Sequence, residues 1–273
     1  MRTTRKVAVV ASLLAGVAAP AVATVPTASA QAAPAWYAYH NVSPAQSEAQ
    51  VKRLKAQGYR PITVNVSDGE RYAAVWLKDG SSTEWGIWQG MSPGGFQKRF
   101  DAGLKDGAQP VSVSATGSGD SAVFTAIWEK KGGSFLTKSN LTPERFGAVN
   151  KQAVAQGLAL TSVDAYGTPG DVRYVGVWTA NTGGAWYYTY GYSRQKYEAE
   201  FRARKAKGFR PVKVAVAPDG TYTAVWRKDG RRYANYIDMS SSGYQVRFNQ
   251  LKDQGLHPVQ VNAEGGKYAA IWE

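Results

Sequence analysis

The one arrangement in this sequence with the residue types of a covalent catalyst is Ser193 followed by Lys196, with Tyr233 and Asn235 further along the chain. Residues three apart share one face of a helix, so the lysine amine could take the serine proton and the tyrosine could complete a proton relay. The position of Ser193 argues against this chemistry. It directly precedes an amphipathic segment, where a serine is typical of a helix N-cap. The four equivalent segments begin with Ser or Thr and lack a lysine three residues on. We therefore expect no catalytic residue.

The sequence offers few residues for catalysis or metal binding by histidines and carboxylates. The chain has two histidines, His40 and His257, and no cysteine, so we expect neither a metal site nor a cofactor. The carboxylates in predicted turns, where Asp commonly bonds the local backbone, are Asp68, Asp120 and Asp219. Those in or beside predicted strands are Glu84, Asp164 and Asp238. Glycoside hydrolysis needs two carboxylates facing each other across a cleft, and the sequence places no such pair.

Aromatic residues are the strongest candidates for binding. They gather at the start of repeated segments, and the candidate binding residues are Trp36, Tyr37, Tyr39, Trp85, Trp88, Trp186, Tyr188, Tyr190, Tyr233 and Tyr236. Alternate residues of a strand face opposite sides, so a run such as 186–190 must place aromatics on both faces. Exposed rings beside Arg and Lys suit sugar rings, peptide backbones or nucleic-acid bases. The alternative is that the rings pack against neighbouring segments.

These residues belong to a unit of roughly fifty residues that occurs five times. Each unit ends in an aromatic residue, two further residues of any type, Val or Ile, and Trp. The five terminal tryptophans, which we expect in the core, are Trp76, Trp128, Trp178, Trp226 and Trp272. Repetition replaces the two domains that 273 residues would suggest with one array of stacked units.

Local signals predict the elements of one unit. A Ser or Thr N-cap, in three units followed by Pro, begins a helix with an apolar face, and Gly ends it. Gln46 can complete a capping box in the first unit. Next come an alternating strand such as 61–66, a turn such as Asp68-Gly69, and the returning strand that ends in Trp. With the opening aromatic strand, the unit is β-α-β-β.

The alternation of apolar and polar residues predicts sheets with one face under helices and the other face open. We therefore predict an α+β protein whose five tandem β-α-β-β repeats form a curved antiparallel sheet, an open half-barrel, with helices on one face. The alternative is a closed five-bladed α/β propeller. The open form is favoured because the array starts and ends on complete units.

Residues 1–30 have the features of a secretory signal peptide, a basic start, an apolar middle and small residues before Ala30. Residues 31–273 are expected to form one repeat domain, with units at about 36–80, 81–133, 134–184, 185–230 and 231–273. The net charge is +13, of which three cations lie in 1–30 without any Asp or Glu, leaving +10. A basic extracellular protein attracts anionic cell-wall polymers. No second apolar stretch predicts a transmembrane segment after residue 30.

The fivefold order of S-P-x-x-F helix start, G-x-x-P-V strand entry and Y-x-A-V-W ending resembles the bacterial tandem repeat domain of polyglycine hydrolases, over residues 36–273. In that family the repeats form a half-barrel beside a catalytic domain that resembles class C β-lactamases and cuts glycine-rich peptide. No such domain is found in this sequence. The resemblance implies a recognition or scaffold array.

The expected function is a secreted, non-catalytic scaffold or binding module. Its partner would be an extracellular polysaccharide, peptide or protein, such as a cell-wall glycan, a glycine-rich peptide or a hydrolase, and nucleic acid is not expected. The alternative is a serine hydrolase related to penicillin-recognising enzymes that uses Ser193 and Lys196.

Overall fold

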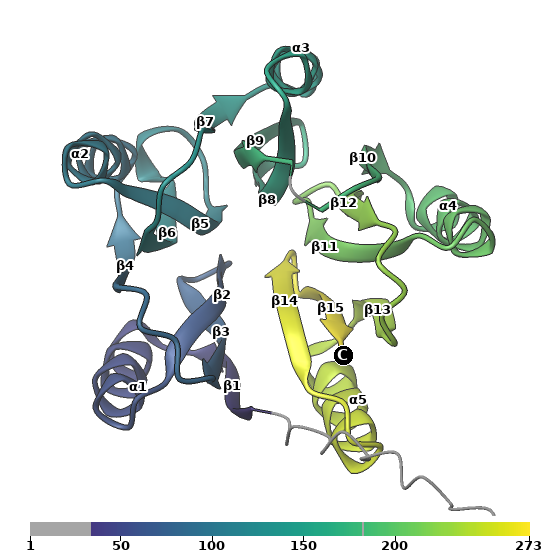
Figure 1. Cartoon of the computed structure of the whole chain (residues 1–273). Coiled ribbons are helices and arrows are strands. Elements are labelled where there is room, and N and C mark those ends of the chain that lie inside the picture. The colour runs from purple at the N-terminus through teal and green to yellow at the C-terminus, as the bar shows by residue number, and fades with distance from the viewer. Residues whose placement is uncertain (1–33, 182) are drawn as a thin grey trace, which may run out of the picture. The chain divides into compact units, whose positions relative to one another are not determined.

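The computed structural model describes residues 34–181 and 183–273, so the predicted signal peptide lies outside the described residues. The described part, Pro34–Glu273, is one compact unit in which the same four elements occur five times (Figure 1). Among the helices of these described residues, none is both long and apolar enough to cross a membrane.

Every repeat has a strand, a helix and two further strands in that order. The first strands are β1 (Ala35–Val42), β4 (Trp85–Met91), β7 (Phe135–Leu141), β10 (Trp186–Tyr192) and β13 (Ala234–Met239). The helices are α1 (Pro44–Ala56), α2 (Pro93–Lys105), α3 (Pro143–Ala155), α4 (Arg194–Ala206) and α5 (Ser241–Asp253). The second strands are β2 (Arg60–Ser67), β5 (Ala108–Thr116), β8 (Leu158–Thr168), β11 (Arg210–Val216) and β14 (Pro258–Glu264). The third strands are β3 (Arg71–Lys78), β6 (Val123–Lys130), β9 (Asp171–Ala180), β12 (Tyr222–Arg227) and β15 (Lys267–Trp272), and η1 (Gly119–Ser121) precedes β6.

The predicted caps account for the helix bounds. Each helix has 13 residues and begins directly after a Ser or Thr whose side chain accepts a hydrogen bond from the backbone N–H three residues on. Gln46 completes the capping box of α1, as predicted. Beyond the C-cap of each helix stands a glycine with φ between 69° and 78°, a left-handed conformation that disfavours side chains.

Each repeat forms its own three-stranded antiparallel sheet, and the third strand lies in the middle, as in the order β1-β3-β2. The α+β class and the five β-α-β-β repeats are confirmed. The strands form five separate sheets instead of one continuous curved sheet, and no backbone ladder joins one sheet to the next among the described strands.

Both faces of every sheet are covered. On β3, Tyr72 and Trp76 share a hydrophobic cluster with Leu54 of α1, in their own repeat. The alternate residue Val75 faces the other way and joins the cluster of the fifth repeat around Trp272. Five such clusters each unite one repeat with the next. The prediction of an open second face is therefore wrong, because the apolar face of the adjacent sheet covers it.

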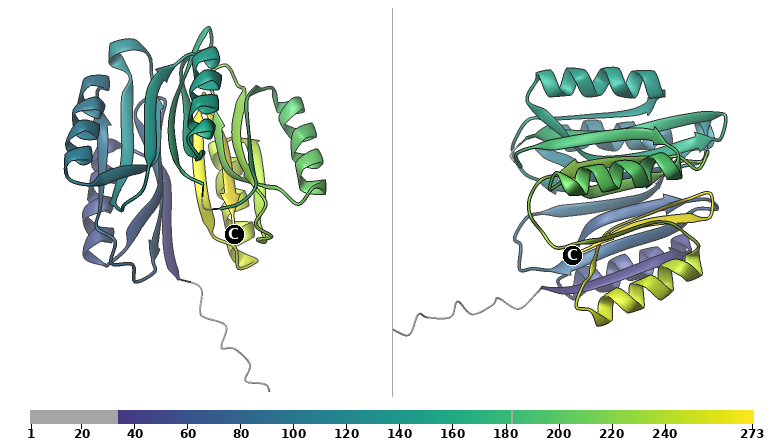
Figure 2. Two further views of the ribbon diagram at one scale, coloured as in Figure 1. Left: turned by 45° about the horizontal axis from the view of Figure 1, so that its top comes forward. Right: turned by 90° about the vertical axis from the view of Figure 1, so that its right-hand side faces the viewer.

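The second strands lie innermost around a common axis, and the helices lie outside (Figures 1 and 2). The fifth repeat also contacts the first: the Ala263 N–H donates to Asn65 Oδ1 at 3.0 Å, and His40 Nε2 lies 2.9 Å from Gln245 Oε1. The two ends of the array thus meet as in the five-bladed alternative, although each sheet stays open and no strand pairing closes a barrel.

Polar side chains connect the inner strands. Asn65 donates to Ser114 Oγ at 3.0 Å, and the Ala115 N–H donates to Asp164 Oδ2 at 3.0 Å. Asn262 donates to Asp164 Oδ1 at 2.7 Å, across the intervening fourth repeat. All four polar side chains are buried and hydrogen-bonded, as buried polar groups must be to avoid a desolvation cost.

Candidate functional site

The structure places the ten candidate aromatic residues at the packed surface between strands and helices. Tyr39 is buried at 8% exposure, and the other nine are half-buried. The terminal tryptophans are buried, at 0 or 1% exposure. Most of the area of these opening-strand rings is therefore used in packing.

The reason for the half-burial is that each opening strand lies between two helices. In repeat 5, the Tyr236 ring packs against α5, and the guanidinium of Arg247 on that helix lies 4.1 Å from the ring centre. Trp36 of the first repeat contacts Phe248 on the same helix, with ring centroids 5.7 Å apart. The aromatic strands therefore join neighbouring repeats, the alternative considered from the sequence.

The second repeat departs from this filled arrangement. A hollow of about 250 Å³, here called the repeat-2 hollow, opens between β4 and α2. Its residues are Glu84, Trp85, Gly86, Trp88, Arg99, Ala102, Gly103, Asp106, Ala108, Trp128 and Lys130. It brings together two of the candidate aromatics, Trp85 and Trp88, with the core residue Trp128. The ring centroids of Trp88 and Trp128 are 5.6 Å apart, and the ring planes are nearly perpendicular.

Two glycines produce the repeat-2 hollow. Gly86 stands six residues before the helix cap and Gly103 eleven after it. In repeat 4 these positions carry Tyr187 and Arg204, whose guanidinium lies 3.4 Å from the tyrosine ring centre, so the two positions face each other. A Cβ on Gly103 would lie only 2.8 Å from the Trp128 ring. Glycine at both positions therefore lets indole rings lie against the backbone and leaves space between strand and helix.

Charged groups surround this aromatic wall. The Arg99 guanidinium lies 5.4 Å from the Trp88 ring centre, within the range of a cation–π interaction. Lys130 Nζ forms a salt bridge of 3.0 Å with Glu84, which is largely exposed. Asp106 adds a second carboxylate to the lining. Apolar ring surface with a few polar groups at its edge is typical of sites for small ligands or single polymer units.

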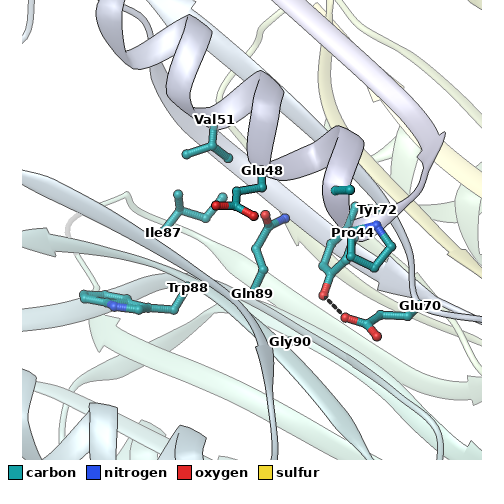
Figure 3. A pocket seen from close by; sticks show the side chains of 10 residues that line it. Pro44, Glu48, Val51, Glu70, Tyr72, Ile87, Trp88, Gln89 and Gly90 are labelled. Carbon is teal, nitrogen blue, oxygen red and sulfur yellow. Dashed lines mark hydrogen bonds between the residues drawn. The ribbon is translucent and has the colours of Figure 1, made fainter.

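A second hollow, of about 440 Å³, lies on the other side of β4, against α1 (Figure 3). Glu48 of α1 and Gln89 of β4 lie next to each other in it, and the Tyr72 hydroxyl donates to Glu70 at 2.9 Å. Glu48 also pairs with Lys52 at 2.7 Å. Similar hollows occur at the joints of repeats 3 with 4 and 5 with 1, so this one belongs to the way repeats meet.

A family model described as "Polyglycine hydrolase-like, structural repeat" matches the chain five times, at residues 33–79, 82–131, 132–181, 183–229 and 230–273. The chain belongs to this structural-repeat family. The match confirms the resemblance stated from the sequence, and the five matches correspond to the five β-α-β-β units.

The residues of the hypothetical serine hydrolase have repeat-forming contacts. Ser193 Oγ accepts a hydrogen bond from the Lys196 N–H at 3.3 Å, as a helix cap. Lys196 Nζ lies 4.0 Å from the Tyr192 ring centre. Asn235 accepts from the Tyr197 hydroxyl at 2.7 Å, and Tyr233 contacts Phe201 with centroids 6.2 Å apart. Each contact is one expected of a structural repeat.

The histidines and two of the turn carboxylates, Asp68 and Asp219, also have structural partners, most of them across the contact between the first and fifth repeats. His40 packs edge-on against Tyr244, and His257 stacks on Trp36. Asp219 accepts from the Thr221 N–H and Asp68 from the Gly265 N–H. Residues 34–181 and 183–273 contain no cluster of three or more His, Asp or Glu that could hold a metal ion.

Asp164 and Glu264 are the two carboxyls in the interior of the structural repeats. Burial raises the pKa of Asp164 to about 7, against hydrogen bonds from Ser114, Asn262 and backbone N–H groups. Burial, with the nearby Asp68 and Asp164 carboxylates, raises the pKa of Glu264 to about 9. Glu264 is therefore a neutral acid at pH 7 and hydrogen-bonds Thr116 at 3.0 Å.

Trp85 and Trp88 were predicted from the sequence as binding residues, whereas Gly86, Gly103 and Arg99 were not. The sequence does contain a signal: when the repeats are aligned on their helix N-caps, larger residues occupy the positions of the two glycines. The residues aligned with Gly86 are Tyr37, Leu136, Tyr187 and Ala234, and those aligned with Gly103 are Leu54, Ala153, Arg204 and Leu251. That these two positions face each other is evident only from the fold.

Proposed function

We propose that this protein is a secreted, non-catalytic module that binds an extracellular polymer, and that the repeat-2 hollow holds one sugar ring of a cell-wall glycan. The observation that carries the proposal is the pair Gly86 and Gly103 beside the indole-lined hollow. Repeat 2 is the one repeat with glycine at both of these positions. The apolar faces of sugar rings pack on indoles, and their hydroxyls suit Arg99, Lys130 and Glu84.

Several observations support a non-catalytic role. The family is described as a structural repeat. Ser193 is engaged as a helix cap and Lys196 lies over Tyr192. The signal-like segment 1–30 supports export, where a wall polymer is encountered. The family description also makes glycine-rich peptide the first competing ligand to test.

The test is a titration of the chain with soluble, undecorated peptidoglycan glycan strands, followed by tryptophan fluorescence and calorimetry. Trp88→Ala should weaken glycan binding by about tenfold, which corresponds to about 1.4 kcal/mol for a lost ring contact. Gly103→Leu, which introduces the residue that repeat 5 carries as Leu251, should weaken binding similarly, because it fills the hollow and displaces the Trp128 ring. Its binding is compared with the parent after circular dichroism has shown that the variant is folded.

Tyr236→Ala is the matched control. Tyr236 is the counterpart of Trp88 in repeat 5, and it too contacts an arginine and a terminal tryptophan. In that repeat, however, the buried side chain of Leu251 stands at the position of Gly103. This variant should bind glycan like the parent. Equal losses in Trp88→Ala and Tyr236→Ala, with both variants folded, would reject the hollow as the site. Binding of a glycine-rich peptide in place of glycan would reject the sugar.

A further inference from the structure

The charge of this protein is concentrated at one end of repeat 4. Five exposed cations lie at the end of α4 and in the connection after β12: Arg202, Lys205, Lys207, Lys228 and Arg232. Lys228 reaches back over the turn after α4, since a Cβ on Gly208 would lie 3.2 Å from Lys228 Cε. Within the described part of the chain, none of these five forms a salt bridge, whereas Arg204, Arg210 and Arg231 do.

Arg227 lies beside this group and lacks the ion-pair partner that its position has in repeats 2 and 5. The residue after the terminal Trp is Glu129 in repeat 2 and Glu273 in repeat 5, and each pairs with an arginine of the preceding repeat. In repeat 4 the position holds Arg227, and the preceding repeat offers Ala159. Its guanidinium contacts Asn181 Oδ1 at 3.4 Å, and partial burial lowers its pKa.

Comparison between repeats shows that this group is local. Three positions can be compared between repeats: the C-cap residue of the helix and the two residues after the terminal Trp. In repeat 4 they hold Lys207, Arg227 and Lys228. The same positions are Asp106, Glu129 and Lys130 in repeat 2, and Gln156, Thr179 and Ala180 in repeat 3. If these cations only solvated the helix surface, the equivalent positions of the other repeats should carry cations too. Only repeat 4 has cations at all three positions.

We propose that this repeat-4 basic surface, formed by Arg202, Lys205, Lys207, Arg227, Lys228 and Arg232, is a docking surface for a linear phosphate polymer. Several cations spread over a helix end and a loop suit a chain with charges at intervals better than one small anion. Arginine presents a planar fork to phosphate oxygens, and lysine supplies point charges. The surface is separate from the repeat-2 hollow and does not depend on the glycan proposal.

The test uses the full chain and fluorescently labelled inorganic polyphosphate, with affinity measured by anisotropy over a series of NaCl concentrations. The triple variant K205Q/K228Q/R232Q changes exposed side chains only, so the fold should be unaffected. Each neutralised phosphate contact contributes about 0.7 to 0.9 to the slope of log affinity against log salt. The triple variant should therefore reduce that slope by about 2 to 3 and weaken binding at least about tenfold.

The matched control is K55Q/K105Q/K252Q, which removes the same charge from the last helical turns of repeats 1, 2 and 5. It should keep most of the affinity. Equal losses in both triple variants would reduce the effect to net charge and overturn the proposal. Equal binding of poly-glutamate, a linear polyanion that carries carboxylates and no phosphate, would overturn the assignment to a phosphate polymer. Polyphosphate binding by Trp88→Ala separates this surface from the glycan site.

Discussion

Glu264 shows how much a single residue depends on its place in the ring. Its counterparts in the first three repeats are Ser67, Thr116 and Tyr166, so the same strand position holds different polar groups. Glu264 is 3% exposed and interacts with Thr116, two repeats away around the axis. A carboxyl so placed is retained as the neutral acid, because ionisation would leave a charge in a desolvated site beside Asp68 and Asp164.

Stability should therefore fall as the pH rises from 7 to 8. The folded chain holds the Glu264 proton up to about pH 9, whereas the unfolded chain releases it near pH 4.5, so the folded state binds more protons between these values. One titrating group changes the free energy of unfolding by at most about 1.4 kcal/mol per pH unit. Asp164 acts in the same direction but below its folded pKa of about 7. Lys213, with its pKa lowered to about 8 by burial, acts oppositely and above that value.

Urea unfolding of the parent chain and of Glu264→Gln at pH 7 and pH 8 measures this effect. The parent should lose up to about 1.4 kcal/mol over the interval, and the variant should lose much less. A variant with the same pH dependence as the parent would show that another group controls this range.

At the scale of elements, the strand-to-helix junction follows a rule that the sequence contained. Two residues before each helix cap stand Asn41, Gly90, Asn140, Gly191 and Asp238, all with φ between 53° and 64°. Each lies where the register of the opening strand shifts. Gly, Asn and Asp tolerate the left-handed region, so five such residues at one repeat position predict a bulge.

Asn140→Val should destabilise the chain by about 1–2 kcal/mol, because a β-branched residue is strained in the left-handed region. Asn140 is exposed, so the change removes little packing. The control Asn140→Gly copies Gly90 and Gly191 and should leave stability nearly unchanged. Thermal and urea unfolding would report both variants. Equal stability of the valine and glycine variants would mean that the bulge is not locally enforced.

Repeat units, helix bounds and strand order along the chain were predictable because they depend on neighbouring residues and were written five times. The site was only partly predictable. Trp85 and Trp88 are conspicuous in the sequence, but the hollow beside them depends on Gly86 and Gly103 facing each other, and they are seventeen residues apart. An exposed aromatic face was expected because the sequence does not show that every opening strand lies between two helices.

For the whole molecule, the join between the fifth and first repeats was not predictable. It depends on the angle that each sheet makes with the next, which the bulk of packed side chains sets and no periodicity reports. In the structure, Ala73 and Val75 of the first repeat enter the cluster around Tyr244 and Trp272 of the fifth. Every repeat thus has two neighbours, and the cost of an exposed terminal face is avoided.

A circular permutant tests whether this join equals the others. Six residues, Asp79 to Glu84, separate β3 from β4. Four residues added between Glu273 and Pro34 would give β15 and β1 the same separation, and new termini could open between Gly132 and Gly133 in an exposed connection. If the fifth and first repeats meet as neighbours, the permutant should unfold in one cooperative transition, within about 1 kcal/mol of residues 34–273, because only loop closure has changed.

Deletion of residues 231–273 is the comparison for this permutant. It uncovers the faces that the fifth repeat shields on both the fourth and the first, and should cost far more stability than rearranging the connection. Thermal unfolding followed by circular dichroism and by tryptophan fluorescence distinguishes the cases. A permutant as unstable as the deletion would mean that the fifth and first repeats do not pack as the other neighbours do, because the new connection would then have to bridge an open gap.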